Sequence, residues 1–216
     1  MPAMASRPLE VVDLGRMSYA DALARQERCV AERRRERAPD PLFLVEHDPV
    51  FTLGRNADPS HILASRDALA ARGVAVSETG RGGDVTYHGP GQLVGYPILS
   101  LRERDRGVLW YVEGLEEILI RTLADFGIEA GRNPANRGAW VGNDKLAAIG
   151  VRITHHITMH GFALNVRTDL AYYKMIVPCG LSDKGVLSMH LLNGSVRMDD
   201  VKARVLQHFR DVFDYD

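Results

Sequence analysis

The sequence predicts an α+β protein with a mixed, largely antiparallel sheet flanked by helices, and three observations support this fold class. The β-compatible segments occur in groups, and helical segments lie between the groups and do not follow every strand, as they would in a doubly wound parallel fold. Residues 108–126 and 198–213 carry apolar side chains at helical spacing over their whole length. The chain has 216 residues, 45% of them hydrophobic, which is enough to form a core without disulfide bonds. We expect residues 1–216 to form a single domain.

In the N-terminal half, each expected element follows from an apolar pattern. Residues 9–14 form a short β-compatible run, and residues 18–37 carry apolar side chains at helical spacing. The basic end of this helix, residues 33–37, is expected to be a solvated C-terminal turn that the helix dipole favours. Cys29 lies on the apolar face of the helix and is expected to be an inert core residue. Next we expect a short helix at 61–72 and strands at 42–46, 50–53, 74–76 and 92–99.

In the C-terminal half, turn residues separate the elements. The long helix at 108–126 ends at Gly127, which is a common residue after a helix. The runs 139–141 and 146–153 flank Gly142-Asn143-Asp144, so we expect a β-hairpin there. A further strand is expected at 157–166 and a final amphipathic helix at 198–213.

Charge and cysteine content exclude several classes of protein. The chain has 27 Lys+Arg and 28 Asp+Glu, a balance that argues against a dedicated nucleic-acid-binding protein. Its two cysteines are too few for a disulfide framework or a four-cysteine zinc site. No apolar run approaches the roughly 18 residues of a membrane span, and the first residues do not match a signal peptide. We therefore expect a cytoplasmic protein.

Glycine is concentrated in one segment, since six of the 20 glycines lie within residues 80–95. The segment lacks the Lys-Ser/Thr of a phosphate-binding loop, and Val85-Thr86-Tyr87 is β-prone, which does not fit a dinucleotide-binding turn that opens a helix. A glycine turn that leads into a strand, with Arg81 and His88 near its ends, suits the wall of an elongated pocket. The residues alone fit equally well a hairpin that needs glycine only for its turn.

Cys179 and Lys145 are the candidate catalytic pair. Cys179 stands between Pro178 and Gly180 at the end of an apolar run, a position where a nucleophile is useful. An unperturbed thiol has a pKa near about 8.5, and an adjacent ammonium such as that of Lys145 would lower this pKa and favour the thiolate. Lys145 could instead act as a base. Without such a partner, a buried structural cysteine and a solvated turn lysine are the commoner cases.

His155, His156 and His160 form the densest histidine cluster. The spacing of His156 and His160 could bind zinc on a helix, but the neighbouring residues are β-prone, and no acidic residue lies between the two histidines. We therefore expect no metal site here. His160 is expected to line a pocket or to have a structural role.

Five segments of the chain, taken together and in their order along the sequence, resemble the lipoyl(octanoyl) transferase family. The likeness runs from about residue 9 to residue 190. The most specific is Arg81-Gly82-Gly83-Asp84-Val85-Thr86-Tyr87-His88-Gly89-Pro90-Gly91-Gln92. The others are residues 47–55, 145–150, 159–166 and 176–180. The main departure is His155-His156, which stands where many relatives carry other residues.

The resemblance implies a fold shared with biotin and lipoate protein ligases, with a small second sub-sheet, and residues 1–216 as a single catalytic acyltransferase domain. It implies transfer of an octanoyl group from octanoyl-acyl carrier protein to a specific lysine of a lipoyl domain, the first step of protein lipoylation. The acceptors would be the lipoyl domains of 2-oxoacid dehydrogenase E2 subunits and the glycine cleavage H protein. The resemblance implies no cofactor and no metal, and we expect neither a nucleic-acid nor a membrane partner.

The resemblance also assigns roles to residues. Cys179 would carry the acyl group as a thioester, and Lys145 would lower the pKa of the Cys179 thiol. The residues that would line the acyl site are Arg81, Gly82, Gly83, Asp84, Val85, Thr86, Tyr87, His88, Ala148, Ile149, Gly150, Gly161, Phe162 and Ala163. Because acyl carrier proteins are generally acidic, we expect a basic patch near the pocket mouth. The candidates for this patch are Arg55, Arg132, Arg137 and Arg152.

Three alternatives remain at this stage. An ATP-dependent lipoate or biotin ligase on the same fold would activate a free acid and would not depend on Cys179. A non-enzymatic scaffold would bind acylated carrier or lipoyl domains without turnover. An unrelated cysteine hydrolase is a weaker alternative, since no His–Asp or His–Asn partner pattern is evident.

Overall fold

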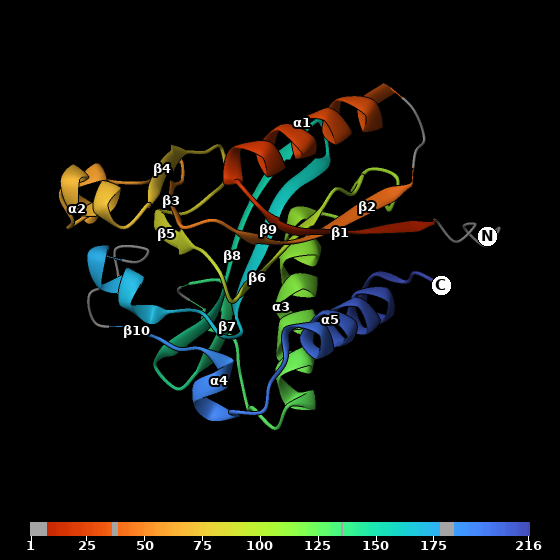
Figure 1. Ribbon diagram of the computed structural model, residues 1–216. Coiled ribbons are helices and arrows are strands. Elements are labelled where there is room, and N and C mark those ends of the chain that lie inside the picture. The colour runs from red at the N-terminus through yellow and green to blue at the C-terminus, as the bar shows by residue number, and fades with distance from the viewer. Residues whose placement is uncertain (1–7, 36–38, 135, 178–183) are drawn as a thin grey trace.

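The computed structural model describes residues 8–35, 39–134, 136–177 and 184–216 (Figure 1). Its main sheet has seven strands, and only two neighbouring pairs, β1–β2 and β8–β10, run parallel. The prediction of a mixed, largely antiparallel sheet is therefore confirmed. In spatial order the strands are β1 (Leu9–Met17), β2 (Asp40–His47), β6 (Gln92–Pro97), β9 (Ile157–Asn165), β8 (Asp144–Thr154) and β10 (Gly185–Val186), with β7 (Gly138–Val141) also paired to β8.

Helices cover both faces of this sheet. In Figure 1, α1 (Tyr19–Arg35) lies across one face, while α3 (Val108–Asp125) and α5 (Met198–Phe213) lie against the other. Strand β2 alternates accordingly: Leu42 and Leu44 belong to the core beneath α3 and α5, and Phe43 and Val45 belong to the core beneath α1. Both faces are thus apolar, which explains why β2 is buried along most of its length.

A second sheet of three strands lies beside the first, with β3 (Val50–Leu53) between β4 (Ala75–Glu78) and β5 (Val85–His88). It has its own core, to which Phe51, Val85, Tyr87 and Ile176 belong. The helical segments around it are η1 (Pro59–His61), α2 (Arg66–Ala71) and η2 (Leu170–Met175). A last short helix, α4 (Met189–Leu192), precedes α5.

The helix expected at 61–72 is shorter than the sequence suggested. It begins only after Ser65, whose hydroxyl accepts a hydrogen bond from the Ala68 amide at 3.2 Å. Ile62 is extended and forms a bridge with Ile176. A tertiary contact therefore takes these residues out of the helix that their local pattern favoured.

The prediction that the basic end of the first helix is solvated is also wrong at Arg33. This side chain is 2% exposed and contacts Asp40 at 3.1 Å and Glu103 at 2.5 Å. Arg104 and the Tyr215 hydroxyl bind the same buried Asp40 carboxylate, at 3.2 Å and 2.7 Å. Arg33 is therefore part of a buried ionic network that ties α1 and β2 to the C-terminal residues.

The hairpins agree with the sequence. Gly142 has φ +58° in the turn between β7 and β8, and His155 and His156 have φ +52° and +64° in the turn between β8 and β9. Paired positive φ values are typical of the two-residue turns that suit twisted hairpins. The described residues contain no group of three or more His, Cys, Asp or Glu that could hold a metal ion. Within the same residues, no helix is both long and apolar enough to cross a bilayer.

Candidate active site

Two neighbouring cavities lie along strand β8 and share Ala148 as a wall residue. The first, here the Lys145 cavity, has a volume of about 20 Å³ and is lined by Thr86, Lys145, Leu146, Ala147, Ala148, Asn165, Tyr173 and Val186. The second, here the His160 cavity, has a volume of about 40 Å³ and is lined by Tyr19, Arg81, His88, Val94, Tyr96, Ala148, Gly150, His160, Gly161, Phe162 and Ala163. Both cavities are small, and Lys145 lines one of them while Arg81 lines the other.

Close backbone packing shapes the wall of the His160 cavity that Gly161 and Phe162 form. A Cβ atom on Gly161 would lie 2.2 Å from the Gly95 carbonyl oxygen, and a Cβ atom on Gly95 would lie 2.2 Å from the Phe162 ring. Only glycine fits at both positions, because β6 and β9 approach each other closely and the aromatic ring fills the remaining space. Close packing between the strands therefore explains why the Met159–Val166 motif has a glycine at Gly161.

Lys145 stands near the start of β8, just after the Gly142 turn. Its ammonium donates a hydrogen bond to the side-chain carbonyl of Asn136 and lies 5.3 Å from the centre of the Trp140 ring. Opposite it, Val186 of β10 is in register with Lys145, and the Leu187 amide donates to the Lys145 carbonyl at 2.9 Å. Both β7 and β10 therefore fix the backbone that carries this lysine.

Glu116 supports the same corner from α3. The carboxylate is fully buried, and it accepts hydrogen bonds from the Gly138 amide and from Arg137, both at 3.1 Å. These contacts hold the start of β7 against α3, and β7 is the strand that pairs with Lys145. Glu116 is therefore a structural support of the lysine.

Arg81 closes the glycine-rich segment onto the small sheet. Its guanidinium donates to the carbonyl oxygens of Thr52 at 2.6 Å and Asp84 at 2.8 Å. The next residue, Gly82, donates its amide to the Val151 carbonyl at 2.9 Å, which attaches the segment to β8. The segment thus bridges the two sheets and brings a nearly buried positive charge to the His160 cavity.

The fourteen predicted acyl-site residues, together with His160, divide into two groups. Nine of them line the two cavities, namely Arg81, Thr86, His88, Ala148, Gly150, His160, Gly161, Phe162 and Ala163. The other six, Gly82, Gly83, Asp84, Val85, Tyr87 and Ile149, are not wall residues of either cavity. Among these, Asp84 contacts His61 at 2.5 Å, and Tyr87 stacks on Tyr172 in the core of the small sheet.

Three buried histidines near the His160 cavity are held uncharged. Burial lowers the pKa of His47 to about 4 and that of His160 to about 3, and it takes the pKa of His88 well below its usual value. The nearby Arg81 charge adds to this effect at His88 and His160. The His47 contacts agree, because Nδ1 must donate to the Met17 carbonyl at 3.1 Å, which leaves Nε2 to accept from the Tyr96 hydroxyl at 2.7 Å.

Several site residues were missed by the sequence reasoning. Tyr19 and Tyr96 line the His160 cavity, and Asn165 and Tyr173 line the Lys145 cavity. Gln92 joins the last two, since its amide donates to Asn165 at 2.9 Å and to Tyr173 at 3.1 Å. Polar residues within otherwise apolar β-strands were the available signal for Gln92 and Asn165, whereas Tyr19 matched an ordinary amphipathic helix.

The structure describes one of the two cysteines, so only the prediction for Cys29 can be compared with it. Cys179 lies outside the described residues, which stop at Val177 and resume at Lys184. The Val177 amide donates to the His61 carbonyl at 2.8 Å, which fixes the last described residue before it. Cys29 is half-buried and packs at the edge of the core beneath α1, so its expected position in that core is only partly right. Burial raises the pKa of its thiol, which is consistent with an inert cysteine.

Comparison with known proteins identifies the family. Residues 18–210 match the family model described as the lipoyl protein ligase A/B catalytic domain. The chain belongs to this family. It is 53% identical to an octanoyltransferase of Solibacter usitatus over 94% of this chain and 92% of that protein, and 48% identical to an octanoyltransferase of Alkaliphilus metalliredigens over 96% of both. The chain is therefore an acyltransferase of the lipoyl protein ligase A/B family.

Solved structures agree on the fold of this family member. A putative lipoate protein ligase from T. acidophilum superposes with a TM-score of 0.76 at 15% identity, over 98% of this chain and 86% of that one. A biotin protein ligase from Aquifex aeolicus superposes with a TM-score of 0.54 at 11% identity, over 97% and 69%. The prediction of a biotin/lipoate protein ligase-like fold with a small second sheet is confirmed.

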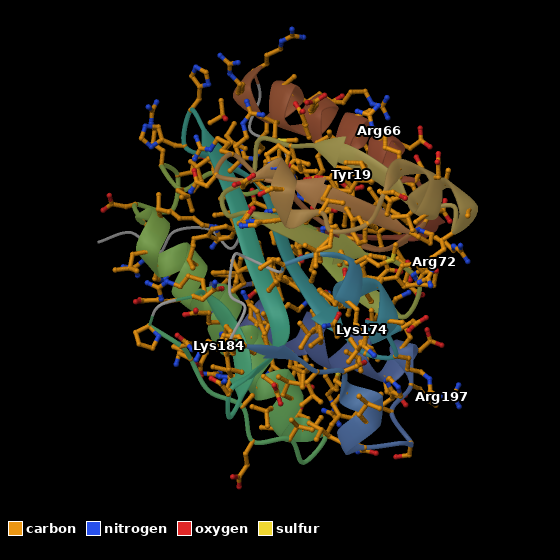
Figure 2. The ribbon with its side chains drawn as sticks, turned by 90° about the vertical axis from the view of Figure 1, so that its left-hand side faces the viewer. Tyr19, Arg66, Arg72, Lys174, Lys184 and Arg197 are labelled. Atoms are coloured by element: carbon orange, nitrogen blue, oxygen red, sulfur yellow. The ribbon has the colours of Figure 1, made fainter. Side chains whose placement is uncertain are left out.

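Two of the four arginines expected near the pocket mouth form ion pairs with acidic residues of α3. Arg132 contacts Glu117 at 2.6 Å and Arg137 contacts Glu116 at 3.1 Å, so acidic neighbours already match two of the four candidate charges. Figure 2 shows Arg66 of α2, Arg72 directly after α2, and Lys174 of η2 in its right half, and none of the three forms an ion pair with a described residue.

Proposed function

We propose that this acyltransferase moves an octanoyl group from octanoyl-acyl carrier protein to a lysine of a lipoyl domain, through a thioester on Cys179. The observation that carries the proposal is the placement of Lys145 and the motif residues around two small cavities along β8 that share Ala148. Identities of 53% and 48% to proteins named octanoyltransferase support the choice of the octanoyl group. Residues 1–216 would act as one catalytic domain, and a cytoplasmic location stays a prediction.

In the first step the Cys179 thiolate attacks the carbonyl carbon of the carrier thioester. A new carbon–sulfur bond forms at Cys179, the bond to the carrier sulfur breaks, and the carrier thiolate leaves and takes up a proton. One thioester replaces another, so the step needs no external energy source. The alkyl chain would lie along the walls formed by Ala148, Phe162 and Ala163.

In the second step the acceptor lysine attacks the Cys179 thioester as a neutral amine. A carbon–nitrogen bond forms, the carbon–sulfur bond breaks, and the amine loses a proton while the Cys179 thiolate is restored. An amide is more stable than a thioester, so this step drives the overall transfer. No cofactor or metal takes part in either step.

Lys145 would stabilise the Cys179 thiolate, and it could also transfer a proton. Its ammonium, held by Asn136, provides a fixed positive charge at the Lys145 cavity. Such a charge favours a thiolate over a thiol both before the first step and when Cys179 leaves in the second. Whether Lys145 also moves a proton is decided by the pH profile of a Lys145→Arg variant, which keeps the charge but cannot act as a base near neutral pH.

The donor would dock on the basic side formed by Arg66, Arg72 and Lys174. Acyl carrier proteins are generally acidic, so their surface charge complements these three cations, which form no ion pair with the residues that the structure describes. We expect the carrier-dependent kcat/KM to fall as salt rises, and to fall further in an Arg72→Glu, Lys174→Glu variant. Arg204→Glu on α5 is the matched control, and a salt-independent rate would contradict this docking site.

Intact mass spectrometry tests the central step. After incubation with octanoyl-acyl carrier protein and no acceptor, the wild type should gain the mass of one octanoyl group, and Cys179→Ala should not. Addition of a lipoyl domain should move that mass to the domain without ATP. Wild-type transfer by Cys179→Ala would refute the proposal, and strict dependence on ATP with free octanoate would instead identify a ligase.

A further inference from the structure

The structure brings together a histidine and an aspartate that no sequence motif pairs. The His61 ring donates a hydrogen bond from Nδ1 to the Asp84 carboxylate at 2.5 Å, and that carboxylate also accepts one from the Asp58 amide at 3.2 Å. Nδ1 therefore carries the ring proton. Nε2 forms no hydrogen bond with a described residue and remains an acceptor. An imidazole that a carboxylate orients in this way is the usual arrangement of a histidine that accepts a proton.

Asp84 lies on the cavity side of the strand that follows it. Val85 belongs to the core of the small sheet, whereas the next residue, Thr86, lines the Lys145 cavity. The Gly54 amide donates to the Asp84 carbonyl at 3.3 Å, which extends the β3–β5 pairing to Asp84. Because side chains alternate along a strand, Asp84 shares the face of Thr86 and precedes it by about 7 Å.

The backbone at His61 is joined to the described segment that ends at Val177. The Val177 amide donates to the His61 carbonyl, and the Leu63 amide donates to the Met175 carbonyl, both at 2.8 Å. Tyr173, a wall residue of the Lys145 cavity, lies in the same segment. The histidine is thus held beside this cavity without being part of its wall, and its side chain is 29% exposed. That position suits a group that acts on a side chain arriving from solvent.

The second step of the proposed reaction needs a proton acceptor, because the lysine nitrogen must lose its protons to become an amide. His47, His88 and His160 are poor acceptors, since burial lowers their pKa values. The proposed function uses Lys145 as an ammonium, and an ammonium has no lone pair to accept a proton. His61 combines partial exposure, a carboxylate partner and an open Nε2 atom.

We propose that His61, oriented by Asp84, accepts the proton of the acceptor lysine in the second step. As the carbon–nitrogen bond forms, the amine proton moves to Nε2 of His61, and the carbon–sulfur bond to Cys179 breaks. The imidazolium then returns the proton to solvent. Asp84 is a positioning residue, which keeps Nδ1 as the donor and stabilises the imidazolium. The inference rests on the proposed function for the thioester that the lysine attacks.

The test separates formation of the octanoyl-enzyme from its discharge. His61→Gln keeps a side-chain donor for Asp84 but cannot take up a proton. Octanoyl-acyl carrier protein should acylate this variant at the wild-type rate, and discharge to a lipoyl domain should be about 100-fold slower. Hydroxylamine, which is already neutral at pH 7, should discharge the variant and the wild type equally fast. His208→Gln is the matched control, because His208 contacts Asp125 at 2.8 Å and lines neither cavity.

A second variant and a chemical rescue distinguish proton transfer from a structural role. Asp84→Asn should slow discharge to the lipoyl domain by a smaller factor, and added imidazole should restore part of the discharge rate of His61→Ala. Discharge of His61→Gln within about twofold of wild type would overturn the inference and leave the proposed function standing. An equal loss towards lysine and hydroxylamine would also overturn it, since a structural role predicts that result. Absence of the octanoyl-enzyme in the wild type would overturn the proposed function and the inference with it.

Discussion

Lowering the pH should destabilise this protein through its buried histidines, even before carboxylates protonate. In the unfolded chain a histidine has a pKa near about 6.5. In the folded protein, burial lowers the pKa of His47 to about 4 and that of His160 to about 3, and also lowers that of His88. As the pH falls below about 6.5, the unfolded state binds these protons and the folded state does not. The stability is therefore complete above neutral pH and is lost as the pH falls towards the folded values.

The size of the effect follows from these pKa values. Between pH 7 and pH 5, a histidine that protonates only in the unfolded state lowers the free energy of unfolding by about 2 kcal/mol. Three such residues give a loss of about 6 kcal/mol. Since a whole domain is typically stable by about 5–15 kcal/mol, the protein should be close to unfolding at pH 5.

Urea unfolding at pH 7, 6 and 5, followed by tryptophan fluorescence, measures this loss. His47→Gln can keep hydrogen bonds to the Met17 carbonyl and the Tyr96 hydroxyl but cannot titrate, so it should remove about a third of the pH dependence. His156→Gln, at the exposed turn between β8 and β9, should leave the dependence unchanged. A loss of less than about 1 kcal/mol in the wild type, or the full wild-type dependence in His47→Gln, would refute the reasoning.

Three further predictions concern single contacts. Asp40→Asn removes the carboxylate that pairs with two buried arginines, and a loss of about 3–5 kcal/mol should lower Tm by roughly 6–20 °C in a thermal melt. Asn136→Ala releases the Lys145 ammonium, so kcat/KM for carrier-dependent transfer should fall about 10–100-fold while Tm changes little. Gly95→Ala places a methyl group 2.2 Å from the Phe162 ring, so it should lower Tm and abolish the thermal shift produced by octanoate.

The elements that the sequence predicted well are those whose cause is local. The β7–β8 hairpin needs a residue at positive φ in its turn, and Gly142 supplies it at φ +58°. The helix α3 was predicted from apolar side chains at helical spacing, and nine residues of this helix are buried. In both cases neighbouring residues in the chain determine the structure, so a local pattern was sufficient.

The errors have a tertiary cause. Arg33 sits in a run of arginines that looked solvated, yet Asp40 and Glu103 enclose it, and Glu103 is 70 residues away along the chain. Residues 62–64 looked helical, yet Ile62 pairs with Ile176. A distant partner changes the free energy of a local conformation by more than the propensities that favoured it.

The candidate site shows the same division between local and distant causes. Arg81, Lys145 and His160 carry charge or hydrogen-bonding groups in segments with an evident motif, so the sequence singled them out. Asn136 and Tyr19 follow no motif, and they reach the site because β7 pairs with β8 and α1 packs on β9. Their importance depends on contacts that no single segment contains.

The charge state of the site could not have come from the sequence at all. A histidine next to a glycine, as His160 is next to Gly161, is equally compatible with an exposed, titrating ring and with a buried, neutral one. The difference arises because α1 covers this end of the sheet and Arg81 approaches from the small sheet, and both effects disfavour the charged form. Lys145 therefore provides a cation in one cavity, and the uncharged His88 and His160 line the other cavity together with the charged Arg81. Under the proposed function, the Lys145 cation suits a reaction in which negative charge develops on the Cys179 sulfur.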